Sequence, residues 1–491
     1  MQDKLHPTVK FAYGAGVMGG AMTTNILAFF ALFFLTNVAG LDPALAGSVL
    51  LVGNIWDAFN DPLIGTLSDR CDRFLPPNII HRWGKRYPWM LAGGISLGIA
   101  FFLVWFIPPF EKDWQMFAYY SFVAILFFSA YTSVMLPASA LAPELTRDYD
   151  ERTSLMSFRS AFSIGGGMCG LLLAKSIFAV MATGPERYLV LGAIGGMFAI
   201  VPTYFSIWGT YPRFQKVRYQ QPPQDAKRLP FKQQVKTILS NRPYLLVIGI
   251  YLCSWLAAQL TASILPYFVV NWMKLSENHL VQAAIAVQGT ALAAVFGWSV
   301  IGRRFGKKIV YLLGVPLWLI AQVGLLLLQP DSVGWMYFFA VMVGIGLSTA
   351  YLVPWSMFPD VVDYDELLTG ERREGIFYGF TVFLEKLGTA IALFLVGRIL
   401  AIAGFISIPR GETAPPPQPE SAMLAIRLII SPLPAILLIF GLILAYFYPI
   451  SREVYQEIYL KLMARRRGEE REWDLGSWDS GIGRRKRKRK S

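Results

Sequence analysis

Long apolar stretches, each about 20 residues or more, recur from one end of this chain to the other. Of its 491 residues, 55% are hydrophobic and only 16% are charged. A bilayer offers no water to backbone N–H and C=O groups, so each stretch must satisfy these groups internally, as a helix does. The sequence therefore predicts an all-α membrane protein without a sizeable water-soluble domain.

Hydropathy predicts twelve transmembrane helices, six on each side of a polar, basic segment. The first six spans run roughly over 11–39, 45–67, 88–108, 115–143, 157–181 and 187–210. The other six run roughly over 243–270, 279–302, 308–328, 334–357, 376–406 and 422–449. We expect an N-terminal bundle (1–210), a cytoplasmic middle loop (211–242), a pseudo-symmetric C-terminal bundle (243–449) and a basic cytoplasmic tail (450–491). Two similar six-helix bundles are typical of a transporter.

Lysine and arginine crowd every second predicted loop, starting with the loop between spans 2 and 3 and including the middle loop. The positive-inside rule therefore predicts that both termini are cytoplasmic. The tail ends in a basic run, 484–490, and the net charge is +13. We expect this run to meet anionic lipid rather than nucleic acid, and a disordered, merely solvated tail is the plainer alternative. Three scattered cysteines give no sign of a disulfide framework.

Two acids, Asp57 and Asp61, lie inside the second predicted span. A charge near the centre of a membrane helix costs about 2.5–3.5 kcal/mol, so both must face a bundle interior, a cavity or a bound cation. Asp57, Asn60 and Asp61 share one helix face, and their oxygen atoms suit a hard cation such as Na⁺. The plainer alternative is that both are ordinary acids at a helix end.

A lysine, Lys386, lies well inside the eleventh predicted span and needs a counter-charge. Its neighbour Glu385 points about 100° away around the helix, so the acids of span 2 are the better candidates. Two carboxylates and one ammonium leave one negative charge, which one Na⁺ or H⁺ would neutralise. We expect this neutral, loaded site to permit alternating access. The alternative is that Lys386 snorkels to a span end.

Charged residues near equivalent loops of the two halves are candidate gating residues. The stretch 65–73 follows span 2, and 297–308 follows span 8, as a faint internal repeat. Plain loop charge and solvation are the alternatives. The candidate gating residues are Asp69, Arg70, Arg73, Arg303, Arg304, Asp360, Asp363, Arg372 and Arg373.

Three stretches resemble the glycoside-pentoside-hexuronide cation symporters, the melibiose permease branch of the major facilitator superfamily. They are WDAFNDPLIGTLSDR (56–70), RWGKRYPWML (82–91) and MFPDVVDYDELLTGERREGI (357–376). The resemblance implies a coupling-cation site at Asp57, Asn60, Asp61 and Thr132. It also implies that Lys386 links the cation and substrate sites, and that Arg159 of span 5 contacts substrate.

The substrate side departs from this pattern. Sugar-binding members carry acids where this chain has Ala21 and Met135, and a tryptophan where it has Ser139. Lysophospholipid carriers of the same branch show a similar start to span 1 and the same Pro-Trp-Ser-Met run, here 354–357. A sugar and an amphipathic lipid both stay open as substrates. We expect the span tryptophans Trp255, Trp318 and Trp355 to serve as packing residues or interface anchors, with lining of a sugar-stacking cavity as the alternative.

These features predict a cation-coupled symporter that imports a small organic solute. The favoured solute is a sugar or glycoside, and a lysophospholipid is the alternative. A non-transporting receptor or scaffold is the rival from another class. No GxxxxGK[ST] loop or nucleophile–base pattern points to an ATP-driven pump or an enzyme. We expect no cofactor beyond the coupling cation, a monomer, contacts with lipid but not nucleic acid and, by the resemblance, a bacterial-type plasma membrane.

Overall fold

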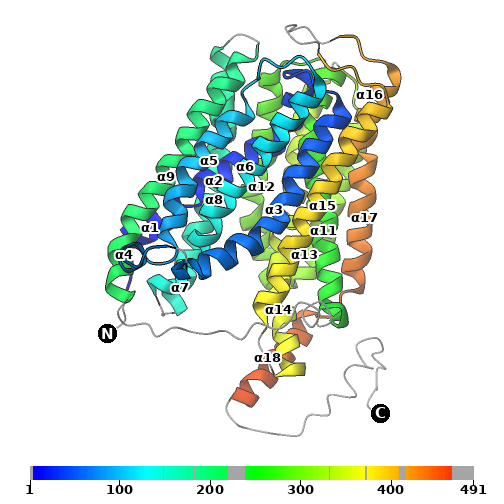
Figure 1. The fold of residues 1–491 in the computed structure, drawn as a ribbon. Helices are drawn as coiled ribbons and strands as arrows, with labels where there is room; N and C mark the ends of the chain where they lie inside the picture. The colour runs from blue at the N-terminus through cyan, green and yellow to red at the C-terminus, as the bar shows by residue number, and fades with distance from the viewer. Residues whose placement is uncertain are drawn as a thin grey trace, which may run out of the picture.

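The computed structural model describes residues 4–73, 75–146, 149–181, 184–218, 238–330, 332–370, 373–408 and 416–466. Every regular element in these ranges is a helix, and Figure 1 shows the long helices running alongside one another. Of these helices, 11 are long and apolar enough to cross a membrane. The remaining predicted span is α3 (Pro43–Asp69), whose polar face carries the two acids. The all-α membrane fold is confirmed.

The helices of the first half are α1 (Pro7–Ala15), α2 (Met18–Asn37), α3, a 3-10 turn (Cys71–Arg73), α4 (Pro77–Trp83), α5 (Tyr87–Val104), α6 (Asp113–Ala140), α7 (Ala142–Leu145), α8 (Tyr149–Val180) and α9 (Glu186–Arg218). Those of the second half are α11 (Arg242–Tyr267), a π-helical turn (Phe268–Trp272), α12 (Glu277–Phe305), α13 (Lys307–Leu327), α14 (Val333–Thr369), α15 (Glu374–Ile402), α16 (Glu420–Ile430), α17 (Pro432–Phe447) and α18 (Arg452–Arg466).

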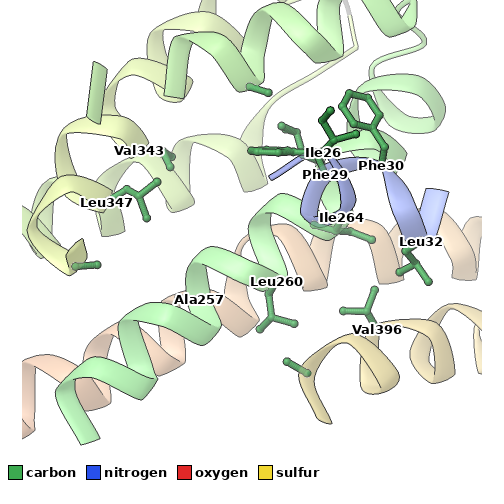
Figure 2. Packing of buried hydrophobic residues seen from close by; sticks show 14 of the residues in the cluster. Ile26, Phe29, Phe30, Leu32, Ala257, Leu260, Ile264, Val343, Leu347 and Val396 are labelled. Carbon is green, nitrogen blue, oxygen red and sulfur yellow. The ribbon is translucent and has the colours of Figure 1, made fainter. Parts of the chain in front are cut away.

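The two halves meet through three helix pairs: α3 packs on α15, α2 on α11 and α8 on α12. Figure 2 shows part of this interface, where apolar side chains of α2 lie near those of α11, α14 and α15. The backbones of α3 and α15 come into direct contact, because Gly47 and Gly397 face each other there. Glycines let two membrane helices approach at van der Waals distance.

Helix α3 is fixed at its start by its own sequence. The Asp42 carboxylate accepts from the backbone N–H groups of Ala44 and Leu45, and Pro43 occupies the first helical position. Pro62 lies inside the helix just beyond the acids and lacks the N–H of a regular helical bond. The helix therefore begins at a defined residue.

Two segments predicted to lie outside the spans contain helix. Helix α9 continues through the start of the predicted middle loop to Arg218, because a helix satisfies its own backbone in water as well as in lipid. The predicted tail also begins as a helix, α18, whose Ile458 and Leu462 are buried against the core. Figure 1 places α18 below α14, at the same end of the bundle as α4 and α7. The basic run at 484–490 lies outside the described residues.

Candidate cation site and solute cavity

The acidic face of α3 packs against α6. Trp56 donates its indole N–H to Ser129 Oγ at 2.8 Å, and the Asn60 amide donates to the Phe128 carbonyl at 3.3 Å. Thr132 Oγ lies 3.2 Å from Asp57 Oδ1 and 2.9 Å from Asp61 Oδ1. A threonine hydroxyl has one hydrogen and can donate to only one of these carboxylates at a time. The four predicted cation ligands are therefore neighbours.

Lys386 of α15 reaches across from the other half into this cluster. Its Nζ lies 2.8 Å from Asp57 Oδ2 and 2.6 Å from Asp61 Oδ2. The Lys386 side chain is 15% exposed, that of Asp57 6% and that of Asp61 26%, so the pair with Asp57 is the more sheltered from water. Lys386 does not snorkel to a span end, and its ammonium stands where a cation would also be attracted.

The ligand set consists of oxygen atoms, which hard cations prefer. Among the described residues, no group of three or more histidine, cysteine or acidic side chains could hold a metal ion. The cluster offers two carboxylates together with neutral oxygens from Asn60 and Thr132. One added positive charge balances Asp57 and Asp61 against Lys386. Binding of Na⁺ at Asp57, Asn60 and Asp61 stays a prediction.

A cavity of about 830 Å³ lies between the two halves. Asp57 and Lys386 reach its wall, so the charged cluster adjoins the space that a solute would occupy. Arg159, the predicted substrate contact, also lines it, from α8. Ala21 and Met135, which stand in place of the family's sugar-binding acids, line the N-terminal side. That side of the cavity is consequently more apolar than the resemblance implies.

The C-terminal wall holds residues whose place the sequence did not predict. Glu385 lines the cavity and accepts a 2.7 Å hydrogen bond from the Tyr251 hydroxyl. Trp255 and Trp355 line it too, whereas Trp318 is fully buried. The sequence signal that could have located this wall was Glu385 itself, because it is a second charged residue inside an apolar span.

At the end opposite α18, an ion pair joins the two halves. Arg187, at the start of α9, pairs with Glu277, at the start of α12, and the Tyr188 hydroxyl donates to the same carboxylate at 2.7 Å. The guanidinium also lies over the rings of Phe178 and Tyr188, with 4.9 and 5.4 Å to the centroids. Close to it, the Thr36 and Tyr267 hydroxyls of the two halves lie 2.7 Å apart. These contacts join the two halves at the end that the charge pattern predicts to face outward.

Replacing Glu277 with glutamine is expected to open this outer end more often. Breaking a buried ion pair from one side costs about 3–5 kcal/mol, because it leaves a sheltered charge unpaired. We expect at least tenfold faster labelling of a Leu35→Cys reporter by an impermeant thiol reagent, in a background without native cysteines. The exchanged pair, Arg187→Glu with Glu277→Arg, should slow the labelling again. Equal labelling rates in all three proteins would contradict the closure.

The candidate gating residues of the C-terminal half are distributed around α14. Lys307 pairs with Asp360 at 2.8 Å, Arg373 with Asp365 at 2.9 Å, and Asp363 accepts from Tyr455 of α18 at 3.0 Å. The Arg304 carbonyl accepts from Arg452 of α18 at 2.9 Å. Helix α18 therefore contacts this cluster through Tyr455 and Arg452. The sequence alone did not predict this contact.

Of the remaining candidate gating residues, the structure describes only some side chains. Arg70 and Arg73 are exposed beyond the end of α3, next to the Lys85–Asp72 ion pair of 3.2 Å, where the hydrogen bond from Lys85 lowers the pKa of Asp72. The side chains of Asp69 and Arg303, and the whole of Arg372, lie outside the described residues. A gating role for all of these residues stays a prediction.

The family model described as MFS/sugar transport protein matches residues 12–452. The chain belongs to this family of the major facilitator superfamily. A protein of Synechocystis sp. described as an uncharacterized symporter is 44% identical, over 94% of this chain and 98% of its own. The sodium-dependent lysophosphatidylcholine symporter 1-A of Danio rerio is 28% identical, over 93% and 89%.

A solved structure agrees on the fold. The nucleoside transporter NupG aligns with a TM-score of 0.59 at 12% identity, over 92% of this chain and 99% of its own. The protein is a symporter of the major facilitator type, and its relatives and fold are those of transporters. The narrower resemblance to the melibiose permease branch stays a prediction.

Proposed function

We propose that this protein is a cation-coupled symporter that imports an organic solute by alternating access. The observation that carries the proposal is the position of Lys386, whose ammonium bridges Asp57 and Asp61 between the two halves. A non-transporting scaffold has no reason to bear the cost of three charges at this depth. The proposal includes no cofactor other than Na⁺ or H⁺.

In the proposed cycle, the coupling cation and Lys386 compete for the same two carboxylates. With Lys386 alone the cluster keeps one negative charge, and closure of the cavity around an unpaired charge is costly. A bound Na⁺, or a proton on one carboxylate, removes that charge. The loaded cluster can then be buried on either side, so the cation gradient drives solute movement.

Two solute classes are proposed, each on a different observation. The family description names sugar transport, and Asn25, Asn54 and Gln288 line the cavity as hydrogen-bonding groups. The cavity wall is otherwise dominated by aliphatic and aromatic side chains, which fit an amphipathic lipid of the kind carried by the Danio rerio relative. Thermal shift of the purified protein with glycoside and lysolipid panels, with and without Na⁺, separates the two.

We further propose that the protein works as a monomer in a bacterial-type plasma membrane, with its basic tail on anionic lipid and no role in nucleic-acid binding. The resemblance and the charge pattern support this placement. Cross-linking in native membranes, followed by mass measurement, tests the monomer.

Replacing Asp61 with asparagine is expected to abolish the cation dependence of solute uptake. The remaining pair, Asp57 with Lys386, is neutral and no longer needs a cation before closure. We expect uptake into vesicles to stop when the solute concentrations inside and outside are equal, and to be unchanged by an imposed Na⁺ or pH gradient. Asp72→Asn, at an exposed ion pair that contributes little to stability, is the control and should behave as the wild type. Full cation dependence of Asp61→Asn would sink the proposed coupling.

A further inference from the structure

The C-terminal wall of the cavity holds a carboxylate that the cation cycle does not use. Glu385 accepts from Tyr251 and, within the part of the chain that the structure describes, has no lysine or arginine within ion-pair distance. Its neighbour Lys386 is committed to Asp57 and Asp61. A sheltered carboxylate without a counter-charge is costly, so Glu385 is stabilised either by a proton or by positive charge from outside the chain.

Aromatic rings line the cavity wall near Glu385. Trp255 of α11 and Tyr351 of α14 both line the cavity. Their ring centroids are 6.1 Å apart and their planes make an angle of 76°, so the two rings form an aromatic corner. Tyr251, the partner of Glu385, stacks beside Trp255 at 6.0 Å and meets Trp355 edge-on at 5.6 Å. The carboxylate and three cavity-lining rings therefore share one wall.

The tryptophan is held in register with the carboxylate. Trp255 donates its indole N–H to Thr389 Oγ at 3.0 Å. Thr389 lies four residues after Glu385, so the two share one face of α15. The hydrogen bond therefore fixes the ring of Trp255 over the face that carries the carboxylate. The orientation of the Trp255 ring is therefore fixed, because its indole N–H is bonded to Thr389 and its face stacks on Tyr251.

The geometry points to a binding site for an ammonium group: we propose that Trp255, Tyr351, Trp355 and Glu385 hold a cationic nitrogen of the transported solute. Aromatic faces attract such nitrogens, most strongly in a desolvated site, and a carboxylate adds direct charge pairing. This inference rests on the proposed symport function, because it takes the solute to enter this cavity.

The local charge balance favours an ammonium over its rivals. Lys386 pairs with Asp57 and Asp61, whereas Glu385 has only the Tyr251 hydroxyl as a partner, so Glu385 is the cavity carboxylate that a solute ammonium can still pair with. Arg159 lines the cavity from α8, in the other half. A neutral hydroxyl would bind the Glu385 carboxylate without offsetting its charge. A proton on Glu385 would make no use of the aromatic corner.

The test compares small ligands in calorimetric titrations of the purified full-length protein at constant Na⁺. Choline and ethanolamine carry the ammonium, and 3,3-dimethylbutan-1-ol is the neutral isostere of choline. We expect choline to bind at least tenfold more tightly than the neutral alcohol. Glu385→Gln and, independently, Trp255→Leu should each weaken choline binding at least tenfold. Trp114→Leu, at an exposed ring outside the cavity, should leave it unchanged.

Two results would overturn the subsite. One is equal binding of choline and its neutral isostere; the other is unaltered choline affinity in both Glu385→Gln and Trp255→Leu. Because Trp255→Leu keeps the carboxylate, a folding failure of Glu385→Gln does not remove the test. Binding is measured without a gradient, so a protein that binds choline but shows no cation-driven uptake would contradict the symport proposal alone.

Discussion

Lys386→Gln is expected to lower cation-driven solute accumulation by at least tenfold. The substitution leaves Asp57 and Asp61 facing each other without the ammonium that lies 2.8 and 2.6 Å from them. Loss of one partner from a buried ion pair costs about 3–5 kcal/mol. One bound cation then still leaves a net negative charge, so the loaded protein resists closure. Radiolabelled solute uptake into vesicles under an imposed Na⁺ or H⁺ gradient measures the loss.

The same variant should still bind the coupling cation, and more tightly, because the competing ammonium is gone. Cation titration followed by intrinsic fluorescence separates this binding from transport. The matched control is Lys175→Gln, which removes a lysine from the exposed side of α8 and should transport normally. Wild-type accumulation by Lys386→Gln would refute the role of the bridge between the halves.

Gly397→Ala is expected to be the most damaging single methyl group that can be added to α15. A Cβ at this position would stand 2.8 Å from the Cα of Gly47 and would also collide with the carbonyl oxygen of Pro43. These are backbone atoms, so the helices themselves must separate. Overpacking typically costs about 1–3 kcal/mol, and here the cost falls only on the state in which α3 and α15 are closed at their outer ends. Transport should fall while the protein still inserts and folds.

The control lies on the same helix. Gly379 has open space around its Cβ direction, so Gly379→Ala should transport as the wild type and gain about 1 kcal/mol from better helix propensity. Thiol labelling of the Leu35→Cys reporter should be faster in Gly397→Ala and unchanged in Gly379→Ala. Equal labelling and equal uptake in the two variants would show that the close approach of Gly47 and Gly397 is not needed.

The coupling cluster shows how far local sequence rules extend. Asp57, Asn60 and Asp61 share a face because residues three and four apart on a helix always do, and the structure keeps that face intact. The same rule placed Glu385 away from Lys386, and the two side chains indeed have different partners. The rule could not say what Glu385 would meet, because Tyr251 comes from a helix more than a hundred residues away.

The sequence by itself determined the class of fold, the near-complete set of spans and the residues whose charge demands a partner at membrane depth. These follow from the cost of exposing backbone and charge to lipid, which each segment must meet locally. Only the tertiary structure decided the distances from Lys386 to the two acids, the Arg187–Glu277 closure, the bracing by α18 and the aromatic wall around Glu385. Each depends on the packing of helices distant in the chain, where small residues and side-chain shapes select one arrangement among many.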